Sequence, residues 1–467
     1  MKFGITLAAI TIAAGAAAAQ PAPPPTPPAT PPGEQPPQWL PGVQDLTAQE
    51  TATPGKLTLT MARAVELALK QQPTVRQARA SAEAANARID SARVPLHPTV
   101  TLAASASVGS TTPHPCADDT SKTCGGYFDP TANTGLSANA SWKITDFGLT
   151  SANVRAAEAN ADASQAGITV SSLDVRRDVE IAYLEALARH RLALVAEATV
   201  KSEEAHLDQA KRFVAAQAKD PIEVAQAQSR AANARSTLAQ AQSNEAVALA
   251  NLRAAIGWID PTRAPAVDPS WPTPVDHDPD DLGQLVEAAR THRPEIVQLD
   301  KQIIAADASL TAAHAERRPV LAANASTQWG PSTNDWAPQP TWTAGLTLSW
   351  QLWDGGRSAA DVRIANANLQ ITIAQRDALL VSLTSALELS RAEIVANRAN
   401  VAASTEAVVA AQAQLKLADA RYTQGLGSQI ELADAQTAVT TASGNLISAE
   451  WQLADAWATL RRALGTF

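Results

Sequence analysis

Residues 341–356 read TWTAGLTLSWQLWDGG, and this stretch decides the fold. Apolar side chains occupy every second position from Trp342 to Leu352, with polar or small side chains between them. A period of two is typical of a strand with one apolar face and one polar face. Trp342 and Trp350 bracket the apolar face at a separation of roughly 27 Å, close to the apolar height of a membrane barrel. Asp354-Gly355-Gly356 ends the strand, and a helical pattern starts at once.

Two further segments alternate in the same way. They are Thr99–Val108 and Gly135–Thr145. Asp146-Phe147-Gly148 ends the second of these segments, just as Asp354-Gly355-Gly356 ends the strand that begins at Thr341. The residues between them, Gly109–Thr134, are rich in turn formers and predict a loop. The shorter segment Gly330–Pro340 is its predicted counterpart in the second half.

The two halves of the chain repeat one plan. Three markers of the first half recur at an offset of 221 positions: Pro73, Pro98 and Gly109 match Pro294, Pro319 and Gly330. Three others recur at an offset of 208: Trp142, Asp146 and Gly148 match Trp350, Asp354 and Gly356. Internal repetition predicts architecture more firmly than any short motif. Each half therefore predicts helix, strand, loop, strand, long helix, break and helix.

Long coiled-coil helices are predicted after each second strand. The first runs from Leu149 to about Ala218 and the next from about Ile222 to Ile256. An unbroken seven-residue ladder marks the second copy: Ile373, Leu380, Leu387, Ile394, Val401, Val408, Leu415 and Tyr422. A strict heptad favours a left-handed supercoil against neighbouring helices. Charged residues at Arg176, Arg177, Asp178 and Glu180 predict an outer face in water.

The predicted organisation is as follows: 1–19, signal peptide; 20–56, Pro-rich tail; 57–257, first repeat; 258–281, linker; 282–467, second repeat. No cysteine follows the predicted cleavage site, so no lipid anchor is expected. Export would allow a disulfide between Cys116 and Cys124, and a free pair is the alternative.

Composition and motifs argue against several functions. A net charge of -9 argues against a nucleic-acid surface. The sequence lacks a Gly-x-Ser-x-Gly elbow, a His-Glu-x-x-His pair and a phosphate loop, so no enzyme, catalytic residue or cofactor is predicted. The linker segment 276–281, DHDPDD, could suggest a metal, but Asp280 or Asp281 more simply caps the next helix.

Four strands per chain cannot close a membrane barrel, and lipid does not tolerate an open sheet edge. The sequence thus predicts an α+β chain with a duplicated strand–strand–long-helix repeat. Three copies would form a twelve-stranded outer-membrane β-barrel, continued by a periplasmic α-helical coiled-coil barrel. Trp142, Trp342 and Trp350 would be membrane-interface anchors in contact with lipid, and ordinary core tryptophans are the alternative.

From about Leu57 to Phe467, the duplicated strand–Asp–Gly–helix junctions and heptad helices resemble the TolC-like outer-membrane factor family. The resemblance implies a passive homotrimeric channel-tunnel that exports small molecules through a tripartite efflux pump. Its implied partners are a periplasmic adaptor and an inner-membrane pump of RND or ABC type. A type I protein secretion duct is the alternative. A structural periplasmic coiled-coil or adaptor protein is a further rival, which the duplicated strand–helix plan disfavours.

The second helical break holds the main candidate site. Within residues 421–428, RYTQGLGS, Gly425 and Gly427 permit a sharp reversal between antiparallel helices. Arg421 and Tyr422 with the glycines resemble the family's periplasmic tip, where the adaptor docks. A plain helix turn is the alternative for each residue.

Carboxylates follow this turn. Glu431 and Asp434 lie on one helix face and would form two acidic rings in a trimer, a role that the resemblance assigns to the pore entrance. A solvated helix face is the alternative. The resemblance also implies that Tyr422 latches the tip by bonding Glu223. Two departures are that Gly427 stands where some members carry a basic latch residue, and that the first-half tip contains Pro221.

Overall fold

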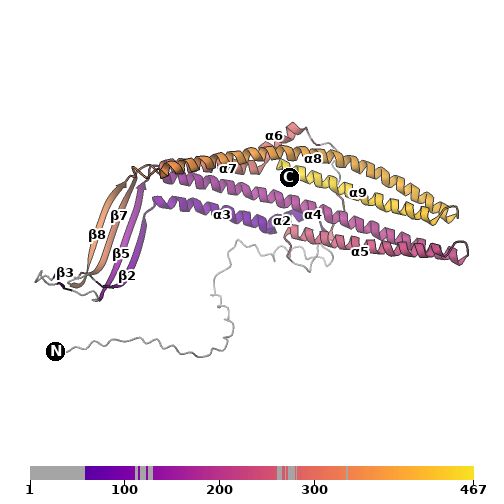
Figure 1. Cartoon of the computed structure of the whole chain (residues 1–467), viewed down its shortest axis with the longest axis horizontal. Coiled ribbons are helices and arrows are strands. Elements are labelled where there is room, and N and C mark those ends of the chain that lie inside the picture. The colour runs from indigo at the N-terminus through magenta and orange to yellow at the C-terminus, as the bar shows by residue number, and fades with distance from the viewer. Residues whose placement is uncertain are drawn as a thin grey trace, which may run out of the picture. The chain divides into compact units, whose positions relative to one another are not determined.

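The computed structural model describes residues 58–110, 114–115, 123–124, 130–259, 266–268, 270–271, 279, 281–332 and 335–466. The predicted signal peptide, the Pro-rich tail and Cys116 lie outside these residues, so the structure does not test the disulfide. Within the unit that begins at Lys56, the long strands lie at one end of a bundle of long helices (Figure 1). The helices are α2 Met61–Gln71, α3 Pro73–Arg93, α4 Leu149–Ala215, α5 Ile222–Ile256, α6 Leu282–His292, α7 Pro294–Ala315, α8 Arg357–Thr423 and α9 Gln429–Leu464.

One antiparallel sheet contains the four long strands in the order β2, β5, β7, β8. Their bounds are Thr99–Ser110, Pro130–Thr145, Val320–Ser332 and Asp335–Ser349. Strands β2 and β8 are the two edges, and neither has a second partner strand in the described chain. Backbone pairing extends the strands beyond their alternating cores, because ladder hydrogen bonds do not depend on the side-chain pattern. The predicted loop Gly330–Pro340 was therefore wrong, and the loop Gly109–Thr134 was drawn too long.

The sheet turns one apolar face outward. Its register aligns Trp142 with Ala323 and Ala323 with Leu346, so the apolar positions of three neighbouring strands share a face. Trp342 is 79% exposed and Leu346 is 70% exposed. Trp350 and Leu352 were predicted inside the last strand, but β8 ends at Ser349 and both lie beyond it. The apolar band is thus confirmed on the sheet and is shorter than the alternation suggested.

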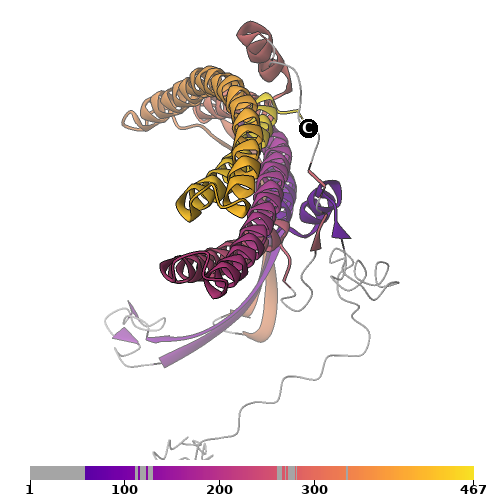
Figure 2. The same cartoon turned by 90° about the vertical axis from the view of Figure 1, so that its right-hand side faces the viewer.

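The helices confirm the duplicated plan. Helices α4 and α8 each contain 67 residues, and Figure 2 shows the long helices arranged in an arc. No residue of the predicted α8 heptad ladder is exposed, and Leu387, Ile394 and Tyr422 are fully buried. Alanine supplies many of the other buried positions, which allows the helix backbones to approach closely.

Two short helices reinforce the middle of the bundle. Helix α2 packs on α4 and α5, and α6 packs on α8 and α9. The predicted linker contains β6, Ala266–Val267, which pairs in parallel with β1, Thr58–Leu59. The buried hydroxyl of Tyr183 donates to the Leu59 carbonyl at 3.0 Å and so fixes this small sheet to α4. Periodicity could not predict a two-residue strand.

Glu180 corrects one prediction of an outer charged face. It is 5% exposed and accepts a hydrogen bond from Arg461 of α9 at 2.9 Å. Nearby, the buried Arg462 binds Asp174 at 2.7 Å and Glu295 at 2.5 Å, which ties α9 to α4 and α7. Buried charges are tolerated when they are paired in this way. The described part of the chain contains no helix both long and apolar enough to span a membrane.

Candidate functional site at the helical tip

The α8–α9 turn is built around two glycines. Gly425 has φ of +74°, a left-handed conformation that residues with a Cβ adopt at a cost. A Cβ on Gly427 would lie 3.1 Å from the Arg421 Cβ and 3.2 Å from the Tyr422 nitrogen. The amides of Leu426 and Gly427 both bond the Arg421 carbonyl, which closes the end of α8. The absence of a basic residue at 427 therefore has a local steric reason.

The α4–α5 turn reaches the same end by other means. Helix α4 stops at Ala215, and Gln217 takes the positive φ of 59° without being glycine. Asp220, which precedes the N-cap residue Pro221, then accepts a hydrogen bond from the Ile222 amide at 2.9 Å just before α5. This turn is one residue longer than its counterpart.

The two turns meet at Tyr422. Its hydroxyl donates to Glu223 Oε2 at 3.1 Å, and its ring contacts Phe213 edge-on with centroids 5.8 Å apart. The side chain is 1% exposed. Burial, together with the hydrogen bond to the Glu223 carboxylate, raises the pKa of Tyr422 to about 12. The structure thus brings the predicted pair together, and its role as a latch stays a prediction.

Lys219 is a part of this cluster that sequence reasoning missed. Its ammonium lies 3.6 Å from Glu223 Oε1 and 5.3 Å from the centre of the Tyr422 ring. Lys219 of the α4–α5 turn therefore supplies a cation to the Tyr422–Glu223 contact. Residue 427 of the α8–α9 turn, being glycine, supplies none. The spacing of four between Lys219 and Glu223 was a signal that could have revealed the pair.

The two acidic candidates differ in their surroundings. Ser428 caps α9 by accepting from the Glu431 amide at 3.1 Å, and the Glu431 carboxylate lies 3.3 Å from Arg421 Nε. Glu431 thus has a local structural role in the turn. Asp434 is exposed and forms no ion pair with another residue in the described ranges. Asp434 is therefore the freer charge for a solute to meet.

At the opposite end, each Asp–Gly junction starts a long helix. Asp146 accepts from the Thr150 amide at 3.1 Å, and Asp354 accepts from the Ser358 amide at 2.8 Å. Hydrogen bonds from the Ser358 hydroxyl and amide hold the pKa of Asp354 at about 2. A negative charge at a helix start is favourable because the first amides lack helical partners. The glycine two residues after each aspartate, Gly148 or Gly356, has a positive φ.

Two of the candidate tryptophans bond backbone carbonyls in the segments that lead from α3 to β2 and from α7 to β7. The Trp142 indole donates to the Leu96 carbonyl at 3.0 Å, and Trp350 donates to the Arg317 carbonyl at 3.1 Å. These two acceptors are themselves 221 positions apart, so the repeat preserves the contact itself. Both rings remain exposed. Their role as interface anchors stays a prediction.

The described residues contain no group of three or more His, Cys, Asp or Glu side chains that could hold a metal ion. Within the linker, Asp281 caps α6 by accepting from the Gly283 amide at 3.2 Å, which confirms its predicted capping role. Residues 272–278 and 280 of the linker lie outside the described ranges.

A family model, curated relatives and solved structures each match most of this chain. The family model described as outer membrane efflux protein matches residues 64–258 and 285–466. Nodulation protein T of Rhizobium leguminosarum bv. trifolii is 22% identical over 86% of this chain and 84% of its own length. Protein CyaE of Bordetella pertussis is 28% identical over 81% of this chain and 78% of its own. The CmeC outer membrane channel of Campylobacter jejuni shares the fold, with a TM-score of 0.75 at 16% identity over 89% of each chain.

Proposed function

The chain belongs to the outer membrane efflux protein family, and on that premise we propose that three copies form a passive channel-tunnel. The unpaired edges of the sheet are the observation that carries the proposal. Strands β2 and β8 each leave one row of backbone groups without a partner strand. In lipid every such group needs a partner, so β8 of one copy pairs with β2 of the next. Three copies supply twelve strands.

The exposed apolar face of the sheet supports a lipid-facing wall. Leu102, Trp342 and Leu346 are more than two-thirds exposed. A contiguous apolar surface of this kind needs either a partner or a membrane to cover it. The alternate side chains of these strands are polar or small, which suits a wet interior. The predicted signal over residues 1–19 would deliver the chain for assembly.

The helical layer supports a tunnel that continues the barrel into the periplasm. Helix α8 turns its heptad ladder into the bundle, with Leu387, Ile394 and Tyr422 fully buried, and most charged side chains of the long helices stay at least partly exposed. The tips then lie farthest from the membrane, where a periplasmic adaptor and an inner-membrane pump would dock. In this arrangement Tyr422 and Glu223 hold the tip closed. Glu431 and Asp434 surround the entrance and favour cations through their local field, without catalysis.

Fractionation and recording test the proposal together. The purified full chain should come from the outer membrane, migrate as a trimer in mild detergent and form ion-conducting channels in planar bilayers. A monomer that conducts no ions would refute it. Copurification after crosslinking in the native host would identify the attached pump. An RND-type pump would support small-molecule efflux, and an ABC transporter with a protein cargo would instead support type I secretion.

A further inference from the structure

Two adjoining cavities form one groove on the layer made by helices α3, α4, α7 and α8. The first, of about 400 Å³, lies among α3, α4 and α7, and the second, of about 500 Å³, lies among α4, α7 and α8. They share Asn160 and Gln302. We call this surface the amide groove and define it by the polar residues Arg88, Asn153, Asn160, Gln298, Gln302 and Asn368.

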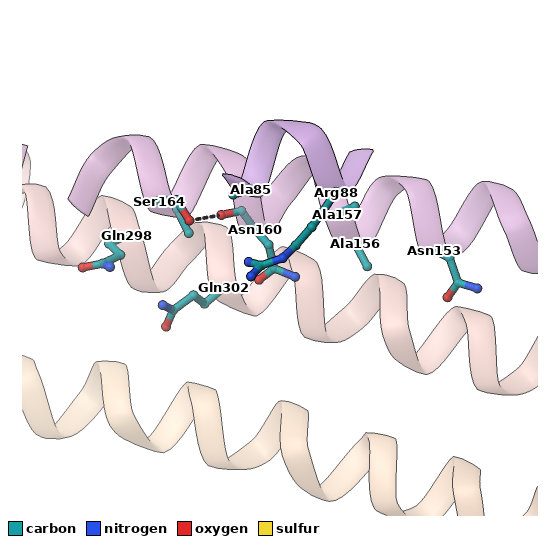
Figure 3. Close-up of a pocket in the computed structure, with 10 residues that line it drawn as sticks. Ala85, Arg88, Asn153, Ala156, Ala157, Asn160, Ser164, Gln298 and Gln302 are labelled. Carbon is teal, nitrogen blue, oxygen red and sulfur yellow. Dashed lines mark hydrogen bonds between the residues drawn. The ribbon is translucent and has the colours of Figure 1, made fainter. Parts of the chain in front are cut away.

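The amide groove carries one cationic side chain, Arg88 in the first cavity, and one acidic side chain, Asp361, which lines the second cavity and lies 3.7 Å from Arg357. Figure 3 shows the Arg88 side chain extending from α3 toward Asn160 of α4, with Gln298 and Gln302 projecting from α7 beside it. Buried alanines such as Ala85 and Ala156 form the floor and leave room above it. Each amide offers two donors and an acceptor, so the wall can bond both anionic and hydroxyl oxygens.

Ion pairs between the same helices involve residues outside the groove lining. They are Arg93–Glu158 at 2.8 Å, Lys301–Asp162 at 2.8 Å and Arg376–Asp300 at 2.7 Å. Asp162 lies two residues from Asn160, about 200° around α4, which places it on the other face. Arg88 forms no ion pair with any residue in the described ranges. Its charge is thus available to a ligand.

We propose that the amide groove binds hydroxylated organic monoanions through a carboxylate that pairs with Arg88. A guanidinium presents parallel donors that match a carboxylate. A single cation balances one negative charge, and the surrounding amides bond the neighbouring hydroxyl groups. Helices α4 and α7 are the two inner members of the layer, so a neighbouring copy that packs against α3 or α8 leaves the groove's centre open. The inference rests on the proposed channel, because the groove meets cargo only if it faces the lumen.

Gluconate block of single channels tests the proposal. The purified full-length protein is recorded in planar bilayers in potassium chloride while gluconate is added, with sorbitol at matched concentration to correct for viscosity. We expect Arg88→Gln to raise the gluconate concentration for half-block about tenfold, the factor that corresponds to about 1.4 kcal/mol. Gln302→Leu should raise it by a smaller factor. Arg93→Gln, a matched loss of charge on the same helix, should leave it unchanged.

Equal gluconate block in the wild-type and Arg88→Gln channels would overturn the inference, as would equal block by gluconate and sorbitol. An Arg93→Gln effect as large as that of Arg88→Gln would also overturn it, because general charge would then explain the block. If no variant and no wild-type protein forms channels, the proposed function itself has failed. The two failures are therefore separate.

Discussion

Replacing Tyr422 with phenylalanine removes the hydroxyl that donates to Glu223 at 3.1 Å and keeps the ring that packs against Phe213. A hydrogen bond to a charged acceptor contributes about 1.5–3 kcal/mol. We expect the low end, because Glu223 keeps Lys219 at 3.6 Å after the change. About 1.4 kcal/mol per chain shifts a closed–open balance tenfold, and three tips that open together would multiply that shift to about a thousandfold.

Single-channel recording measures the effect. The Tyr422→Phe protein should spend more time in a high-conductance state than the wild type at the same voltage. Tyr183→Phe is the matched control, because that hydroxyl is also buried and bonded, at 3.0 Å to the Leu59 carbonyl far along α4 from the tip. Tyr183→Phe should lower thermal stability and leave conductance unchanged. A folded Tyr422→Phe trimer with wild-type conductance would refute the latch.

Three further predictions address the entrance, the membrane face and pH. Asp434→Ala should weaken block by multivalent cations in bilayer recordings more than Glu431→Ala does, because Glu431 already pairs with Arg421; unchanged block in the double variant would remove both from the entrance. Leu346→Lys, on the exposed apolar face, should impair membrane insertion by about 2–4 kcal/mol per chain, and normal trimer yield would show that this face does not meet lipid. Burial, aided at Tyr422 by Glu223, raises the pKa values of Tyr183 and Tyr422 from 10.0 to about 12. Their neutral hydroxyls therefore contribute fully to stability below pH 10, and this contribution falls as the pH rises toward 12. A thermal melting point that stays flat from about pH 9 to 12 would contradict this.

The larger features of the fold followed from periodicity. Helix α5 begins and ends at the predicted residues, and α4 begins at the predicted Leu149. Period-two and period-seven patterns are strong here because each strand or long helix has one apolar side. The Asp–Gly junctions were predictable for a related reason, since a helix start needs an acceptor and a turn needs a positive φ.

The details that escaped prediction depend on contacts between distant segments. Glu180 is a charged residue of the kind expected on an outer face, but its hydrogen bond from Arg461 of another helix makes its burial tolerable. The Lys219–Glu223 pair has a spacing of four that the sequence shows, but Lys219 meets the Tyr422 ring only because two turns far apart in the sequence end at the same level. The amide groove was not foreseen either, since glutamine and asparagine carry no periodic signal. Pairing across helices of this kind has no trace in a single sequence.

The equal lengths of α4 and α8 limit how such a chain can change in evolution. Both helices have 67 residues, and both must deliver their turns to the same level for Tyr422 to meet Glu223. Inserting one residue in either helix would advance its turn by about 1.5 Å and rotate it by about 100°. Insertions and deletions in these helices would therefore survive only as coordinated pairs, one in each copy. The strand loops are free of this constraint and could diverge in length independently.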